Sequence, residues 1–275
     1  MRGGSRLEAD SPVGDNRRMI SRVFVLAVSA SLAAMTQISP VVRTELVPTG
    51  TLRAGINTGN AILARKDAGG GWRGVAIDLT TELAQRLGVP HEIVLFDTVG
   101  AMVDAAKTGA WDVAFLGSEP ARETVIGFSA AYLEIEATYL VPGASLLRNA
   151  SEVDRAGVRV GAPSRANYEL YLTRTLKNAE LVRADGQDAA FGLLTSGKVD
   201  ALAGLKQALI GLNEKMAGSR ILDGRFMAVQ QSIGVPKGRD AALAYLRGFV
   251  EDVKASGLVA RAIEQTGARG VSVAP

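Results

Sequence analysis

The spacing of apolar residues along the chain alternates between short continuous runs and helical spacing. This alternation predicts strands interleaved with helices. Short apolar runs bounded by turn residues are typical of buried strands, and they occupy 51–56, 91–96 and 112–116. Between these runs, 77–87 and 99–107 carry apolar residues at helical spacing, and a glycine closely follows each segment. Strands that alternate with helices in this order predict a parallel sheet flanked by helices.

A second run of the same kind follows and predicts a second lobe. Strands are expected at 158–162, 180–184 and 201–205, and helices at 167–175, 187–195 and 206–216. Extended segments are expected at 137–141 and 226–235, a hairpin tip at 68–72, and closing helices at 241–256 and 259–266. We therefore predict an α/β fold with two lobes, each a mainly parallel sheet flanked by helices.

The first forty residues have a different character from the rest. Three arginines precede an apolar run at 23–34, and small residues gather near its end. This arrangement is typical of a secretory signal peptide, and the run is shorter than the roughly 20 residues that cross a bilayer. A short membrane anchor or a core helix is the alternative. We expect a leader at 1–40 whose signal peptide is cleaved, and hence a periplasmic protein.

Composition narrows the chemistry further. Of 275 residues, 47% are hydrophobic and 21% charged, an ordinary globular balance with ample core. The chain has no cysteine and one histidine, His91, so disulfides, thiolate sites and histidine clusters are excluded, and we expect no metal and no cofactor. Beyond the leader, 26 basic residues face 25 acidic ones, without a basic stripe among aromatics. Nucleic acid is therefore not expected as a partner.

The segment 111–129 carries the most informative chemistry. A buried strand ends in the turn residues Gly117 and Ser118, and Arg122 follows shortly after. A guanidinium offers two parallel donors that match a carboxylate, and such a turn offers N–H groups and a hydroxyl. Arg122 is therefore a candidate for holding a carboxylate; a surface arginine paired with a neighbouring glutamate is the alternative.

This strand, turn, Arg and Phe-Ser sequence resembles the signature of the family 3 extracellular solute-binding proteins, the periplasmic receptors of ABC importers for polar amino acids and related small molecules. Residues 50–57 are similar to the family's first strand and 72–79 to the start of its first helix, and the resemblance extends over 48–265. It implies a type II periplasmic-binding-protein fold. The implied parts are lobe 1 at 48–138 plus 234–270, lobe 2 at 143–228, and crossing hinge strands near 138–141 and 229–234.

The resemblance also implies a set of ligand-binding residues in a cleft between the lobes. They are Asn57, Leu63, Gly117, Ser118 and Arg122 from lobe 1, and Ser164, Arg165, Asn167 and Lys206 from lobe 2. Arg122 matches the arginine that clamps the ligand's carboxylate in the family. Asn167 is suited to cap a helix whose free N–H groups attract anions. Capping alone is the alternative for Asn167, and a solvated turn is the alternative for Arg165.

Two departures from the family pattern bear on the ligand. Leu63 replaces an aromatic residue that lies over the ligand, and a leucine followed by Lys206 replaces the aspartate that accepts its ammonium. An ammonium without a carboxylate is costly in a closed cleft, whereas Arg122, Arg165 and Lys206 favour an anion. We expect a mono- or dicarboxylate, or an amino acid whose ammonium meets another acid such as Glu119. An outward-facing Lys206 is the alternative.

The predicted function is a monomeric periplasmic receptor that closes on a small carboxylated solute and delivers it to a membrane ABC permease, without catalytic residues. Two alternatives stay open. Some proteins of this fold dehydrate prephenate or arogenate, which needs an acid or base in the cleft, and Glu119 is the candidate. The other alternative is a ligand-sensing module that acts through a separate signalling protein.

Overall fold

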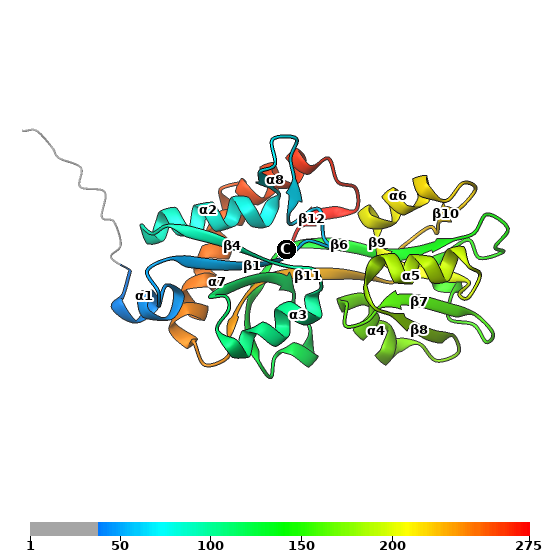
Figure 1. Ribbon diagram of the computed structural model, residues 1–275, viewed down its shortest axis with the longest axis horizontal. Helices are drawn as coiled ribbons and strands as arrows, with labels where there is room; N and C mark the ends of the chain where they lie inside the picture. Colours follow the sequence, from blue (N-terminus) through cyan, green and yellow to red (C-terminus); the bar gives the residue numbers. More distant parts are fainter. Residues whose placement is uncertain (1–37) are drawn as a thin grey trace, which may run out of the picture. The chain divides into compact units, whose positions relative to one another are not determined.

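Two long strands that pair with each other connect the two halves of the sheet. The computed structural model describes residues 38–275, so the predicted signal peptide lies outside the described residues. β6 (Ile126–Val141) and β11 (Met227–Pro236) run antiparallel over most of their length. β11 also pairs with β5 (Val113–Gly117), whereas β6 also pairs with β9 (Ala201–Leu205) (Figure 1). These two crossing strands therefore belong to both halves of the sheet.

Lobe 1 is built on three parallel strands at one end of the sheet. β1 (Leu52–Asn57) lies between β4 (His91–Phe96) and β5. Leu52, Ile56 and Phe115 of these strands are fully buried against apolar residues of the surrounding helices. The helices of this lobe are α1 (Pro40–Leu46), α2 (Val75–Leu87), α3 (Val99–Asp104), α7 (Asp240–Ala255) and α8 (Leu258–Thr266).

Lobe 2 repeats this plan at the other end of the sheet. β7 (Arg159–Pro163) lies between β9 and β8 (Glu180–Ala184), again with parallel pairing. Its buried residues form clusters separate from those of lobe 1, with Tyr139 of β6 and Leu172 among them. The helices of this lobe are α4 (Asn167–Thr175), α5 (Gly186–Thr195) and α6 (Lys206–Lys215).

Short elements complete the fold. A hairpin of β2 (Arg65–Lys66) and β3 (Trp72–Arg73) confirms the predicted glycine-rich tip. β10 (Arg220–Ile221) and β12 (Val271–Val273) both pair with β6. Three single 3₁₀ turns are present in the described chain: η1 (Ala105–Thr108), η2 (Pro120–Arg122) and η3 (Ala150–Glu152). The structure confirms the α/β fold with two lobes and two crossing strands, whereas the residue limits of the lobes stay a prediction.

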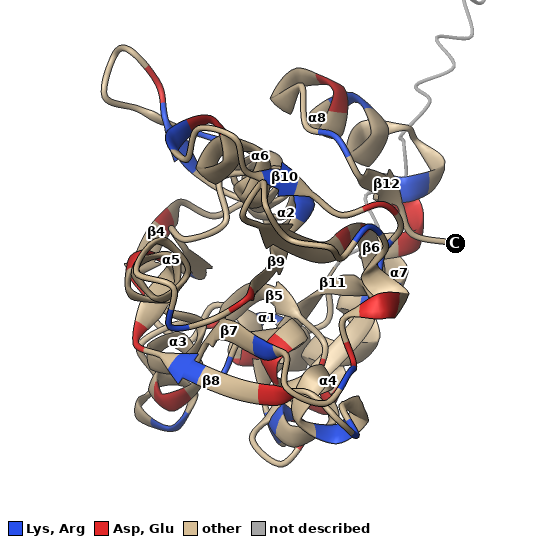
Figure 2. Ribbon diagram, turned by 90° about the vertical axis from the view of Figure 1, so that its right-hand side faces the viewer, with Lys and Arg blue, Asp and Glu red and all other residues tan. Residues whose placement is uncertain are grey.

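An Arg–Asp ion pair of the same type holds the first parallel strand of each lobe in place. Arg53 of β1 donates through its backbone N–H, Nε and NH2 to Asp112, and Arg159 of β7 donates through the same three groups to Asp200. The NH2 to Oδ1 distances are 2.7 and 2.9 Å. Asp112 is fully buried, whereas 40% of the Asp200 side chain is exposed. Figure 2 shows Lys and Arg positions interspersed with Asp and Glu positions along the ribbon.

These two pairs predict a difference in stability between the lobes. Asp112→Asn leaves Arg53 without its buried carboxylate, so we expect a loss of about 3–5 kcal/mol in the free energy of unfolding. Asp200→Asn is the matched control, and an exposed pair contributes only about 0–1 kcal/mol. Urea unfolding followed by circular dichroism measures both. Equal losses in the two variants would contradict the assignment of Asp112 as the stronger anchor.

Candidate solute-binding cleft

A cavity of about 110 Å³ opens between the lobes, where the parallel strands end. Lobe 1 contributes Asn57 at the end of β1, and Asp97 and Thr98 directly after β4. Lobe 2 contributes Ser164 after β7 and Gln187 in the first turn of α5. Ligands of open α/β sheets bind outside the carboxyl ends of strands, so this position is that of a binding site.

The structure divides the nine predicted site residues into two groups. Five of them line the cavity: Asn57, Leu63, Gly117, Ser164 and Asn167. The other four lie near it without lining it: Ser118, Arg122, Arg165 and Lys206. The structure tests none of the expected contacts between these residues and a ligand, so their roles remain predictions.

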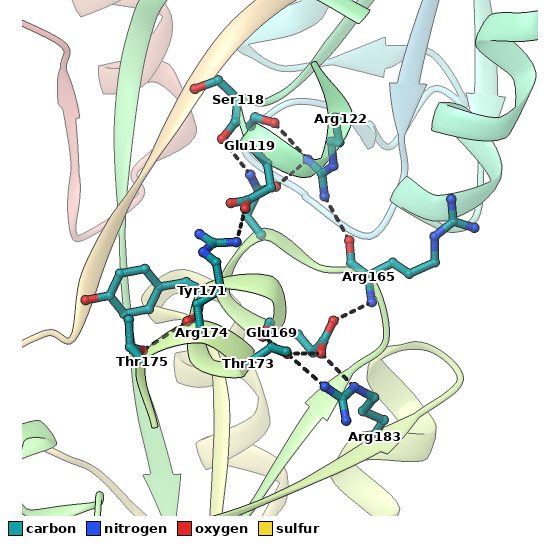
Figure 3. A network of polar contacts seen from close by, with 12 residues as sticks. Ser118, Glu119, Arg122, Arg165, Glu169, Tyr171, Thr173, Arg174, Thr175 and Arg183 are labelled. Carbon is teal, nitrogen blue, oxygen red and sulfur yellow. Dashed lines mark hydrogen bonds and ion pairs between the residues drawn. The ribbon is translucent and has the colours of Figure 1, made fainter. Parts of the chain in front are cut away.

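Arg122 joins the two lobes by hydrogen bonds to the protein itself. The 3₁₀ turn η2 places its side chain at the lobe boundary, where the residue is 3% exposed. NH1 donates to the carbonyl of Gly117 and to Oδ1 of Asn167, both at 2.7 Å, and NH2 donates to the carbonyl of Arg165 at 2.8 Å (Figure 3). Burial lowers the pKa of Arg122 to about 10, because removal of water disfavours the charged form.

Asn167 fills the space beside the turn at the end of β5. It is the first residue of α4 rather than the expected cap, and its side chain extends into lobe 1. Its Nδ2 donates to the carbonyl of Ser118 at 3.0 Å while Oδ1 accepts from Arg122. A Cβ at Gly117 would lie 2.5 Å from Nδ2 of Asn167, so this close approach requires glycine. The N–H of Ser118 donates to Gln230 within the sheet at 2.8 Å.

Two ion pairs also join the lobes outside the cavity. The Arg165 guanidinium donates to both oxygens of Asp104 at 2.8 Å, which lowers the pKa of that carboxyl group. Arg165 itself has a φ of 63°, and its N–H donates to Glu169 at 2.9 Å. Arg174 of α4 pairs with Glu119, whose side chain is buried (Figure 3). The lobes therefore contact each other through their own charged groups.

Lys206 does not line the cavity. Its Nζ donates to Glu136 of β6 at 2.7 Å, so its charge is paired beside the crossing strands. This placement agrees with the outward-facing alternative for Lys206.

Several cavity residues were missed by the sequence reasoning. Asn60, Asp97, Thr98, Gln187 and Gln231 all line the cavity. Asp97 and Thr98 directly follow a predicted strand, and Gln187 was placed at the start of a predicted helix, so their positions relative to strand ends could have indicated them. Gln231 lies inside a crossing strand, where no such signal exists.

Comparisons with known proteins agree with this geometry. Residues 52–267 match the model of the bacterial extracellular solute-binding proteins, family 3. The P235GK mutant of ArgBP from T. maritima has a TM-score of 0.69 and 23% identity, covering 82% of this chain and 99% of that one. An ancestral arginine-binding protein bound to glutamine has a TM-score of 0.67 and 24% identity, covering 78% and 97%.

A third similar structure is the ancestral amino acid-binding protein AncCDT-1, a precursor of cyclohexadienyl dehydratase. It has a TM-score of 0.67 and 24% identity, covering 80% of this chain and 97% of that one. At such identities the likeness of the structures shows the shared two-lobe fold, and the family match extends over most of the chain. The chain belongs to family 3 of the bacterial extracellular solute-binding proteins.

Proposed function

We propose that this protein is the solute receptor of an ABC importer, which closes on a small, amino-acid-like solute and delivers it to a membrane permease. The observation that supports this proposal most is the cavity between the lobes, lined from both sides at the strand ends. A solute that contacts both lobes binds the closed arrangement better than an open one, so it shifts the hinge equilibrium toward closure.

The proposal does not retain the expected preference for an anion. That preference depended on the three cations Arg122, Arg165 and Lys206. Arg165 pairs with Asp104, Lys206 pairs with Glu136, and the guanidinium of Arg122 donates to protein oxygens. An amino-acid-like solute is supported by the relatives, one of which is an arginine-binding protein bound to glutamine. A carboxylate on the solute is not required by these observations.

A periplasmic location is part of the proposal. The family is extracellular, and among residues 38–275 no helix has the length and apolar character that crossing a membrane requires. The dehydratase alternative depended on Glu119, which pairs with Arg174 and does not line the cavity. The kinship with a dehydratase precursor concerns the fold, so the receptor function is the better supported of the two.

The receptor proposal predicts ligand-induced stabilisation and closure. In a thermal-shift screen of amino acids, their amines and dicarboxylates, a bound solute at 100 times its Kd adds about 2.7 kcal/mol to stability. Small-angle scattering with the same solute should show a smaller radius of gyration. His91→Ala, at the opposite end of β4 from the cavity, is the control and should bind unchanged. A screen without any stabilising solute would count against the receptor function.

Closure itself predicts a steric effect at Gly117. Gly117→Ala places a methyl group 2.5 Å from the Asn167 side chain, so the lobes should separate and solute affinity should fall at least about tenfold. Combining it with Asn167→Ala removes the clashing atoms and should restore closure in scattering. Gly192→Ala is the matched control, because its Cβ meets open space on α5 and a helical alanine is favourable by up to about 1 kcal/mol. Unchanged binding by Gly117→Ala would refute this contact.

A further inference from the structure

We infer that the cleft takes a neutral or cationic solute bearing both a hydrogen-bond donor and an acceptor, and that Asn167 occupies the place at Arg122 where a solute carboxylate was expected. This inference rests on the proposed receptor function and names its class of solute. The solutes it describes are small amides, whose N–H and carbonyl groups supply the donor and the acceptor, so that a carboxylate is dispensable.

The hydrogen-bond donors that were expected to hold a solute carboxylate are already engaged by the protein itself. NH1 of Arg122 donates to Gly117 and Asn167, and NH2 donates to the carbonyl of Arg165. The N–H of Ser118 donates to the neighbouring strand β11. A carboxylate could form two parallel bonds with this guanidinium only by displacing acceptors that lobe 2 supplies. The side-chain amide of Asn167 therefore acts as the internal substitute for that carboxylate.

Two buried amide atoms in the cavity wall lack hydrogen-bond partners among the described residues. Nε2 of Gln187 and Oε1 of Gln231 are both buried without a hydrogen bond, and both residues line the cavity. Gln231 is 4% exposed. The hydroxyl of Tyr168 contacts Oε1 of Gln187 at 3.3 Å, which leaves its Nε2 for another acceptor. An unsatisfied buried polar group is destabilising, so a solute that satisfies both atoms gains affinity.

These two glutamines come from opposite sides of the cleft. Gln187 belongs to α5 of lobe 2, and Gln231 belongs to β11, where it pairs with Gly117 of lobe 1. The β6–β11 ladder shifts register between Gln231 and Ser232, and such an irregularity redirects a side chain from the regular alternation. One solute that accepts from Gln187 and donates to Gln231 would therefore bridge the lobes.

The cavity wall carries little formal charge. Among the lining residues that the structure describes, Asp97 is the one with a formal charge, and no lysine, arginine or histidine is present. A desolvated anion would find no unengaged cationic donor there, because the guanidinium of Arg122 behind the wall is already bound to protein oxygens, whereas a cation would have Asp97 at the exposed rim. Leu63, Phe115 and Val229 provide the apolar part of the wall. The wall therefore favours a neutral or cationic solute with an apolar portion.

The test compares solutes in which a carboxamide replaces the carboxylate, so that an acceptor is kept and the negative charge is removed. The common amino acids and their α-carboxamides, such as arginine with argininamide, are measured at equal concentration by thermal shift and the best pair by calorimetry. We expect the carboxamide of the best pair to bind at least as tightly as the acid. Gln231→Leu should weaken binding of that carboxamide at least about tenfold, as the loss of a buried hydrogen bond predicts. The inference is overturned by an acid that binds 100-fold tighter than its carboxamide, which corresponds to about 2.7 kcal/mol in binding free energy.

Asn167→Ala supplies a gain of function that a purely structural role would not produce. Removing the Asn167 side chain exposes NH1 of Arg122, so the ratio of acid to carboxamide affinity should rise at least about tenfold over wild type. Urea unfolding verifies that the variant is folded. An equal loss of affinity for acids and carboxamides would assign Asn167 a structural role and overturn its part in specificity.

Failure of this inference is distinguishable from failure of the receptor function. If acids bind tightly and Arg122→Gln abolishes their advantage over carboxamides, the protein is a receptor with a carboxylate clamp, and only the inference fails. If no acid or carboxamide stabilises the wild-type protein and scattering shows no closure, both the inference and the receptor function fail.

Discussion

The buried guanidinium of Arg122 is the interaction on which the closed cleft depends. A charge removed from water needs several well-placed partners, and Arg122 finds them in Gly117 of its own lobe and in Asn167 and Arg165 of the other. Two of its three acceptors leave when the lobes separate, so the desolvation of this charge and the approach of the lobes are one coupled event. The lowered pKa of Arg122 is the sign of that cost, since neutral carbonyl and amide oxygens compensate a cation less fully than a carboxylate does.

The ion pairs around this centre differ in what they contribute. Arg165 and Asp104 are both half-exposed or more, and a pair of this kind orients surfaces while adding little free energy. Glu119 is buried, so its pairing with Arg174 on α4 constrains the position of the lobes more strongly, because a buried acid that loses its cation is destabilising. The charged pairs thus determine how the two lobes align, and the Arg122 contacts stabilise the centre of the interface between them. The cavity keeps its shape because groups outside it determine how closely the lobes approach.

The sequence predicted the strands and helices well, since their apolar periods follow directly from burial on one face or on both. The resemblance to the family also placed Asn57 and Ser164 in the cleft, and both line the cavity at the ends of strands. The sequence reasoning missed α1 and the first part of β6, a strand that starts in lobe 1 with mixed polar and apolar residues. The partners of Arg122 were beyond its reach for another reason. Gly117 and Asn167 are fifty residues apart, and only the closed fold shows that a lobe 2 amide fills the space beside that glycine.

The position of Gln231 connects solute binding to the hinge more directly than contacts with the lobes alone would. β11 pairs with β5 in lobe 1 and with β6, which continues into lobe 2, so Gln231 lies on one of the two strands that connect the lobes. Its unpartnered Oε1 is buried at the point where the ladder shifts register. A donor on the solute that reaches this oxygen stabilises one conformation of the crossing strand itself. Because the same strand accepts the N–H of Ser118 beside the Arg122 contacts, the solute and the lobe contacts act on one element, and each favours the closure that the other needs.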